Sequence, residues 1–246
     1  MFRFYVNEDA VYDNRATITG SDVNHIRNVL RMKSGDRIIV NTGAGTDYYC
    51  RIDQVNNDEI LLEVESSRPC MAELPVKLYL FQALPKQDKM EFIIQKAVEL
   101  GVFEVIPVIT KRCVVKLDDK KRQEKKIGRW QSIAEAAAKQ SARGIIPEVK
   151  QPMRFADAIK YARNLSYNMI PFEHANGMEY SRQIMNQAVE SDSVGIFIGP
   201  EGGFEDEEIE AAKNAGINVI SLGNRILRTE TAGMCVLSIL MFQISK

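Results

Sequence analysis

Three glycines and a proline stand within five residues at 199–203, where the chain reads GPEGG. A β-branched apolar run at 194–198 precedes them and is typical of a strand buried on both faces. Glycines at the end of a strand let the backbone approach a ligand with no Cβ in the way, although they also suit an ordinary tight turn. The acidic run at 205–208 suits the first turn of a helix, because a helix N-terminus carries partial positive charge. These residues predict a strand, a bend and a helix that ends near Gly216.

A second loop, at 223–231, reads GNRILRTET and contains charged groups that a reaction could use. It follows an apolar run at 219–222, which predicts another buried strand, and it precedes an apolar helical segment from Ala232 onward. Two such strand exits, side by side in a parallel sheet, form a ligand crevice at the carboxyl ends of the strands. The sequence has neither a GxGxxG fingerprint nor a phosphate-binding Gly-Lys-Ser/Thr at these loops, so spacing alone does not identify the ligand.

Taken together, GPEGGF and LGNRILRTETA closely resemble the RsmE family, the 16S rRNA uridine-N3 methyltransferases of the SPOUT superfamily. The resemblance covers essentially the whole chain in order. It is carried further upstream by IRNVLR at 26–31, KM at 89–90, QK at 95–96, ELG at 99–101, Glu135, Gln140 and Arg143. It implies methylation of uridine N3 in the decoding region of an assembled or nearly assembled small ribosomal subunit. Asn224 stands where the family commonly has proline, which implies altered loop stiffness and unchanged activity.

The elements that must position these loops show two different patterns of predicted secondary structure. Residues 1 to about 67 read as a small β-rich unit with one helix after Ser21, which suggests a small barrel. Its candidate strands are 2–6, 16–19, 36–42, 46–55 and 59–65. The segment 68–75 contains two prolines and is the best domain boundary.

From Val76 onward strands alternate with helices, which predicts an α/β unit with a mainly parallel sheet and helices on both faces. The predicted strands are 76–81, 102–108 and 166–172 with the two that end at the loops, and the predicted helices are 86–100, 119–143, 155–162 and 178–189. The resemblance implies a PUA-like β-barrel RNA-binding domain at 1–70 and a SPOUT methyltransferase domain at 74–246. It also implies a C-terminal trefoil knot that includes both loops, whereas ordinary topology rules favour an unknotted sheet.

The resemblance further implies that S-adenosylmethionine lies against the backbone of the two loops, with apolar contact from the strand end at 170–172, and that no metal is required. The cofactor-binding residues that it implies are Ile198, Gly199, Pro200, Gly202, Gly203, Ser221, Leu222, Gly223, Ile226, Leu227, Arg228, Thr229 and Thr231. Thr229 and Thr231 can also cap the final helix, which is a sufficient structural reason for them.

Methylation of uracil N3 requires that its proton leave, because the protonated nitrogen is a poor nucleophile. Arg225 and Arg228 are candidate donors to the uracil oxygens or the flanking phosphates, and Glu230 and Glu201 are candidate bases. Alternatively, Arg228 and Glu230 pair with each other and only shape the loop. The two histidines, His25 and His174, are interpreted as structural.

A basic segment between 109 and 130 is the strongest RNA-facing signal from the residues alone. It contains nine Lys and Arg against three acids, a local balance of 9 − 3 = +6 in a chain with a formal net charge of −1. The candidate RNA contacts in and near it are Lys111, Arg112, Lys121, Arg122, Lys125 and Lys126. The resemblance adds Arg27 and Arg31, four apart on one helix face, as phosphate contacts and Gln140 and Arg143 as nucleotide contacts. The alternative is a solvated helix face.

Composition sets the remaining expectations. The 246 residues suit two domains, and four scattered cysteines with two histidines argue against a zinc site and favour a reduced, cytoplasmic protein. The N-terminus lacks signal-peptide order, and the longest apolar region is too short to span a bilayer. The final helix is apolar around nearly its whole circumference, which predicts burial all round, either in the core or at a subunit interface. The resemblance favours a homodimer; a non-catalytic RNA-binding assembly factor, or a methyltransferase with another RNA target, is the rival prediction.

Overall fold

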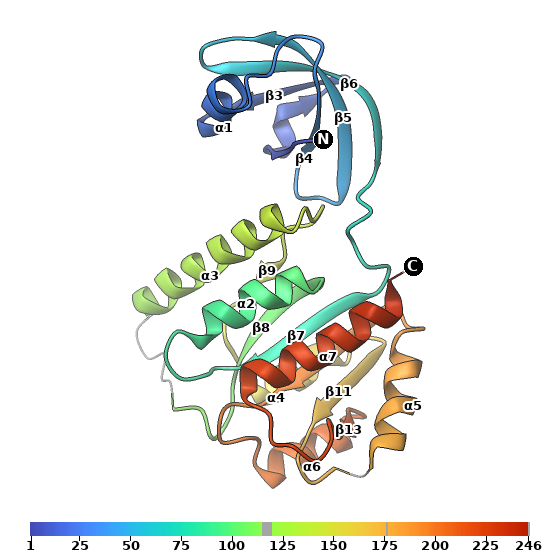
Figure 1. Cartoon of the computed structure of the whole chain (residues 1–246). Helices are drawn as coiled ribbons and strands as arrows, with labels where there is room; N and C mark the ends of the chain where they lie inside the picture. The colour runs from blue at the N-terminus through green and yellow to red at the C-terminus, as the bar shows by residue number, and fades with distance from the viewer. Residues whose placement is uncertain (115–119, 176, 246) are drawn as a thin grey trace. The chain divides into compact units, whose positions relative to one another are not determined.

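The computed structural model describes residues 1–114, 120–175 and 177–245, and the chain divides into two compact units (Figure 1). The first unit comprises Met1–Glu73 and Ala138–Ile146, and the second comprises Leu74–Ala137 and Pro147–Lys246. Nothing in the sequence pattern indicated that 138–146 belongs with the N-terminal residues. None of the helices in the described part of the chain has the length and apolarity that crossing a membrane requires.

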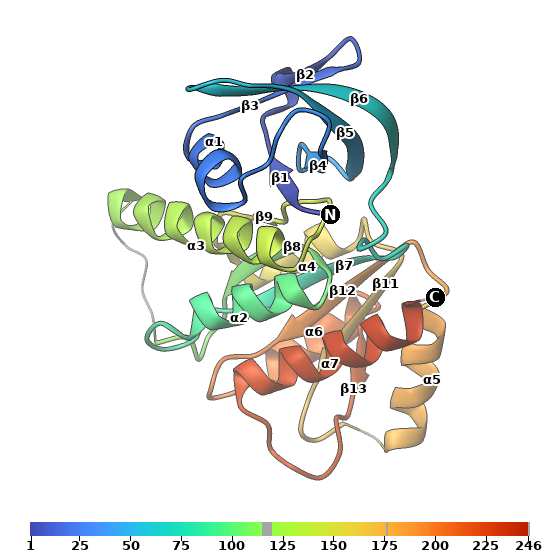
Figure 2. The same ribbon diagram turned by 45° about the horizontal axis from the view of Figure 1, so that its top comes forward.

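The first unit is built on one curled sheet with the strand order β1-β4-β5-β6-β3-β2 (Figure 2). Its strands are β1 (Arg3–Tyr5), β2 (Val11–Tyr12), β3 (Arg15–Thr19), β4 (Arg37–Asn41), β5 (Thr46–Val55) and β6 (Glu59–Pro69). Alternate residues of these strands point to a shared core, in which Ile18, Ile38 and Ile52 are almost fully buried. The sequence thus correctly predicted the strands of this unit except β2, which it missed.

The helix of the first unit begins as α1 (Ser21–Asn24), continues as a π-helical turn (His25–Val29) and ends there. Arg31 has φ +53°, in the left-handed region, so it lies beyond the helix. The prediction that Arg27 and Arg31 share one helix face is therefore wrong. A 3₁₀ turn (Glu8–Ala10) is the other short helical element of this unit.

One carboxylate, that of Glu73, anchors the segment 138–146 to the first unit. Its Oε1 accepts hydrogen bonds from the backbone N–H groups of Gly144 at 2.8 Å and Ile145 at 3.0 Å. Its Oε2 lies 2.7 Å from the guanidinium of Arg143, whose side chain is 3% exposed. A Cβ on Gly144 would lie 2.3 Å from the Cβ of Cys70, so only glycine fits there. These contacts join residues about seventy positions apart, which local periodicity cannot reveal.

The second unit contains a parallel sheet with the order β10-β8-β7-β12-β11-β13, and β9 pairs with β8. Its strands are β7 (Lys77–Ala83), β8 (Val102–Ile109), β9 (Glu148–Val149), β10 (Met153–Arg154), β11 (Tyr167–Pro171), β12 (Ser193–Ile198) and β13 (Asn218–Ile220). The expectation that the strands before the two loops lie side by side is wrong, because β11 pairs with both and lies between them.

Helices cover both faces of this sheet, as the alternation predicted. The helices in contact with its strands are α2 (Lys89–Glu99), α4 (Phe155–Ala162), α5 (Met178–Ala188), α6 (Asp206–Asn214) and α7 (Thr229–Ile244). The remaining long helix, α3 (Lys120–Gln140), ends in residues that belong to the first unit. In Figure 1, α2 and α7 lie next to each other in front of the sheet and α4 lies behind it. Leu100 is the C-cap of α2, and Gly101, with φ +89°, follows it in the left-handed region that ends the helix.

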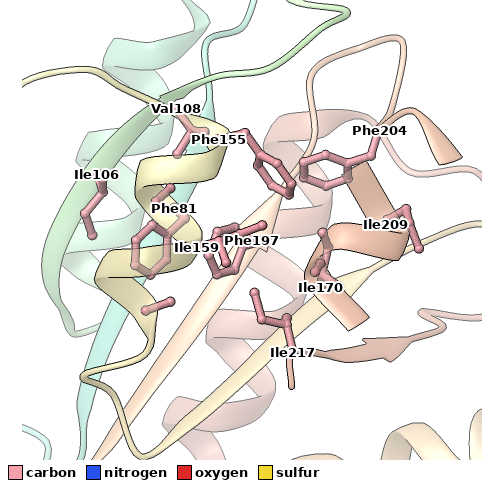
Figure 3. Packing of buried hydrophobic residues seen from close by; sticks show 13 residues of the cluster. Phe81, Ile106, Val108, Phe155, Ile159, Ile170, Phe197, Phe204, Ile209 and Ile217 are labelled. Atoms are coloured by element: carbon pink, nitrogen blue, oxygen red, sulfur yellow. The ribbon is translucent and has the colours of Figure 1, made fainter. Parts of the chain in front are cut away.

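The core behind the sheet is formed by aromatic and branched side chains from β7, β8, β12, α4 and α6 (Figure 3). Phe81 and Phe197 stack with ring centroids 4.3 Å apart, and Phe155 packs edge-on against Phe197. Phe204, directly after the GPEGG segment, packs on Phe155 with centroids 5.5 Å apart. This contact secures the downstream end of the glycine-rich loop to the core.

The C-terminal helix α7 packs on β7, β12 and α2 through one side. Val236, Leu237 and Leu240 are almost fully buried, but Phe242 is 81% exposed in the single chain. The exposed Phe242 excludes burial of the whole helix in the core of one chain, and burial at a subunit interface stays a prediction.

Candidate functional site

A cavity of about 700 Å³ lies where the glycine-rich loop, the 221–229 loop and the segment after β11 converge. It is formed entirely by the second unit. All the predicted cofactor residues except Thr231 line it, and so do Pro171 and Phe172 at the predicted strand end. Of the four catalytic candidates, Glu201, Arg225 and Arg228 line the cavity directly. The crevice is thus built from three strand ends, those of β12, β11 and β13.

A buried hydroxyl joins the two loops. The Oγ1 of Thr229 donates to the carbonyl oxygen of Gly199 at 2.6 Å and accepts from Nε2 of Gln82 at 2.9 Å. Gln82 is fully buried at the end of β7, and Thr229 is 5% exposed. The predicted capping role of Thr229 is wrong, because Arg228 occupies the N-cap position of α7 and its side chain forms no capping hydrogen bond among the described residues. Thr231 is exposed and lies outside the cavity lining.

Lys89, at the start of α2, is a site residue to which sequence reasoning assigned no role. Its ammonium lies 3.1 Å from Oε1 of Glu201 and 3.4 Å from Oε2 of Glu230. Both oxygens of Glu201 also accept from the backbone N–H of Lys86, at 3.1 and 3.4 Å. Because Lys89 and the two carboxylates are more than a hundred residues apart in the chain, no spacing rule could have found them. Glu230 does not line the cavity itself, and its ion pair with Lys89 connects it to the site.

The ion pairs perturb the protonation of the site. Burial raises the pKa of Glu201, but hydrogen bonds from backbone N–H groups and from Lys89 outweigh burial, so the pKa lies below its ordinary value. The hydrogen bond to Glu201 and the nearby charge of Glu230 raise the pKa of Lys89. The cavity therefore holds an anionic Glu201 beside a cationic Lys89 at neutral pH.

The two arginines of the second loop are exposed at the cavity. Neither Arg225 nor Arg228 forms an ion pair with any residue in the described part of the chain. The alternative in which Arg228 pairs with Glu230 is not observed, since Glu230 pairs with Lys89. Both guanidinium groups are thus available to an anionic or oxygen-rich ligand.

Arg112, a predicted RNA contact, binds the glycine-rich loop instead. Its Nη1 donates to the carbonyl oxygen of Gly202 at 2.6 Å, and its Nε and Nη2 bind the two oxygens of Glu205 at 2.9 and 3.0 Å. This bidentate pair raises the pKa of Arg112 and lowers that of Glu205. Arg112 therefore positions the loop from outside the cavity.

Lys111 also binds acidic residues that follow the glycine-rich loop. Its ammonium pairs with Glu207, and its backbone N–H donates to Oε1 of Glu208 at 2.9 Å. The other oxygen of Glu208 accepts from the N–H of Glu205 at 2.9 Å and so caps α6. The acidic run that follows the glycine-rich loop therefore both starts α6 and binds the 111–112 segment.

The remaining predicted RNA contacts have varied surroundings. Lys121, Arg122, Lys125 and Lys126 are exposed on α3, and Lys116, Asp118 and Asp119 of the basic segment lie outside the described residues. In the first unit Gln140 and Arg31 are exposed, and Arg27 donates to the carbonyl oxygen of Asn57 at 3.2 Å. Arg143 is buried on Glu73, a placement that does not support the predicted nucleotide contact.

Two family profiles match this chain. Residues 72–241 match an RNA methyltransferase domain, and residues 18–65 match an RNA methyltransferase PUA domain. The chain is 38% identical over 230 residues to ribosomal RNA small subunit methyltransferase E of Bacillus subtilis, which covers 92% of this chain and 90% of the relative.

Solved structures give the same picture. Ribosomal RNA small subunit methyltransferase E from Neisseria gonorrhoeae, bound to S-adenosyl methionine, is 30% identical, with a TM-score of 0.80 and coverage of 99% of this chain and 98% of that one. A putative methyltransferase from Legionella pneumophila in complex with the same cofactor is 32% identical, with a TM-score of 0.79 and coverage of 98% and 97%.

Proposed function

The chain belongs to the RNA methyltransferase family that includes ribosomal RNA small subunit methyltransferase E, and we propose that it methylates N3 of a uridine in 16S rRNA with S-adenosylmethionine. The observation that carries this proposal is the cavity of about 700 Å³ between the two predicted cofactor loops. The two matching family profiles support the proposed domain assignment, in which a PUA-like RNA-binding unit at the N-terminus precedes the methyltransferase unit. The C-terminal trefoil knot stays a prediction.

The residues of the cavity fit the cofactor. Gly199, Gly202 and Gly203 present backbone without a Cβ, so a ligand can contact main-chain groups directly. Leu222 and Leu227 add apolar surface for a purine ring. Bound there, S-adenosylmethionine supplies an electrophilic methyl group, and its positive sulfonium suits a cavity that contains carboxylates.

The protein's own groups supply the rest of the chemistry. The N3–H proton passes to a carboxylate, Glu201 or Glu230, and the charge that develops on the uracil oxygens is stabilised by Arg225 and Arg228. Glu201 has a lowered pKa and is therefore ionised at neutral pH, the form that a proton acceptor requires. The guanidinium groups are ready to donate because they form no ion pair among the described residues.

We infer that the RNA partner is the small ribosomal subunit and that the exposed cations of α3 contact its phosphates. Lys121, Arg122, Lys125 and Lys126 form this exposed stripe. Each phosphate contact steepens the salt dependence of affinity. We infer a homodimer through α7, because this helix is apolar around nearly its whole circumference, whereas only one side packs on β7, β12 and α2 and Phe242 stays exposed. A cytoplasmic location follows from the ribosomal substrate.

The direct test is calorimetric titration of S-adenosylmethionine into the purified protein and into Gly203→Val. Gly203 has φ +70°, so a β-branched residue strains the loop backbone. Gly216→Val is the matched control, because Gly216 also has positive φ, +81°, and open space around it but lies outside the cavity lining. Binding by the wild type and the control that is lost in Gly203→Val supports the proposal.

Methyl transfer to small subunits that lack the modification completes the test. A folded wild type that neither binds the cofactor nor methylates subunits contradicts the proposal and favours the non-catalytic RNA-binding alternative. Methylation of another RNA, with none at the 16S uridine, favours a same-fold enzyme with a different target.

A further inference from the structure

One ammonium group joins three separate parts of the second unit at the cavity. Lys89 begins α2, Glu201 belongs to the glycine-rich loop and Glu230 belongs to the first turn of α7. The ammonium lies 3.1 Å from the Glu201 carboxylate and 3.4 Å from that of Glu230. No other cation forms an ion pair with either carboxylate among the described residues. This single contact therefore connects both walls of the cavity to the helix beside it.

The surroundings partly shield this contact from solvent. The side chains of Lys89, Glu201 and Glu230 are only 29%, 26% and 16% exposed. Oε2 of Glu230 is buried and accepts no hydrogen bond from the described residues, so the Lys89 ammonium is its charge partner. Partial burial reduces solvent screening, and ion pairs there contribute more than exposed ones.

The charged groups around the Lys89 ammonium determine whether another cation can replace it as the partner of Glu201 and Glu230. Arg225, Arg228 and Glu173 line the same cavity but form no ion pair with Glu201 or Glu230. Lys86 contributes its backbone N–H to Glu201. Without the Lys89 ammonium, two carboxylates share one site with no paired cation, and like charges in one site oppose each other's ionisation.

We propose that Lys89 is a positioning residue of this site: its ammonium clamps Glu201 and Glu230 together and so holds the glycine-rich loop and α7 at a fixed separation. The role in catalysis rests on the proposed function, because it concerns the carboxylates that accept the N3 proton. The clamp itself is a property of the cofactor-free chain.

The clamp is tested first without cofactor or RNA, by ¹³C NMR titration of the glutamate carboxyl carbons in the wild type and in Lys89→Met. Glu201→Gln assigns the Glu201 signal. Loss of the ammonium should raise the pKa of Glu201 by about one unit, since a neighbouring opposite charge lowers a carboxyl pKa by about 1–3 units. Lys89→Arg keeps the charge and should titrate like the wild type. Lys213→Met, which breaks a lysine–glutamate pair on α6 away from the cavity, is the matched control.

A second variant protects the test against misfolding of Lys89→Met. In Glu230→Gln the Lys89 ammonium forms an ion pair with Glu201 alone, so the pKa of Glu201 should fall below the wild-type value. A Glu201 titration that is unchanged in both variants overturns the clamp.

Single-turnover methylation of small subunits then separates positioning from general stability. In Lys89→Met the acidic limb of the pH–rate profile should move to higher pH, with a rate about tenfold lower on that limb, because one pKa unit corresponds to about a tenfold change. A rate lowered equally at every pH indicates a merely structural role and overturns the positioning role. If the wild type methylates no subunit, the proposed function fails, whereas the NMR titration still decides the clamp.

Discussion

Thr229→Val removes one hydroxyl and leaves a side chain of nearly the same shape. The hydroxyl donates to the carbonyl oxygen of Gly199 at 2.6 Å and accepts from Nε2 of Gln82 at 2.9 Å. The side chains of Thr229 and Gln82 are both buried. A net hydrogen bond contributes about 1 kcal/mol, and a buried partner left without one costs about 1–3 kcal/mol. Nε2 of Gln82 keeps its bond to the carbonyl oxygen of Ala83, which moderates the loss. We therefore expect the free energy of unfolding of the second unit to fall by about 2 kcal/mol.

Urea unfolding followed by the fluorescence of Trp130 measures this change. Trp130 is the single tryptophan of the chain, and it is buried in the second unit. Because the hydroxyl holds both cofactor loops together, the affinity for S-adenosylmethionine should also weaken, by up to about thirtyfold for 2 kcal/mol. Thr229→Ser keeps the hydroxyl and should lose less than half as much stability. The reasoning is refuted if Thr229→Val unfolds within about 0.5 kcal/mol of the wild type, or if the serine and valine variants lose stability equally.

Three further predictions concern the cavity and the exposed side of α7. Arg228→Ala should lower methylation by about 10²-fold or more while cofactor affinity stays largely intact, since one lost donor to developing charge costs that much; normal methylation removes the proposed role of Arg228. Hydrogen bonds lower the pKa of Glu201, so its carboxylate stabilises the fold above its unfolded pKa and this stability is lost as the pH falls through the folded value. Glu201→Gln should therefore lose less stability on acidification than the wild type in urea titrations across that range, and parallel loss in both proteins contradicts the assignment. Phe242→Glu should shift the protein from dimer to monomer in light scattering, whereas Tyr12→Glu, at an equally exposed aromatic residue of the first unit, should not; an intact Phe242→Glu dimer places the subunit interface elsewhere.

The local elements were predictable because each depends on neighbouring residues. The apolar run at 194–198, the glycines after it and the acidic run at 205–208 became β12, a bend and α6 in that order. The glycine-rich loop and the 223–231 loop also came together at one cavity, as parallel strand exits predict. The resemblance supplied the identity of the cofactor, which spacing alone did not.

Other contacts could not be predicted from the sequence pattern, because their partners are distant in the chain. Strand periodicity shows that β11, β12 and β13 exist, but not that β11 lies between the other two. A basic run predicts solvent and RNA, yet Arg112 binds Glu205 and the backbone of Gly202. Arg143 has the charge of an RNA contact but is buried against Glu73.

The sequence by itself therefore determined the β-rich and the alternating strand–helix parts of the chain, the loops that line the cavity and the residue types in them. Tertiary structure alone decided which charges meet: Lys89 with Glu201 and Glu230, and Thr229 with Gln82 and Gly199. The physical reason is the distance along the chain over which each interaction acts. Backbone conformation and amphipathic period act over a few residues, whereas an ion pair or a buried hydrogen bond depends on the order in which distant strands and helices pack.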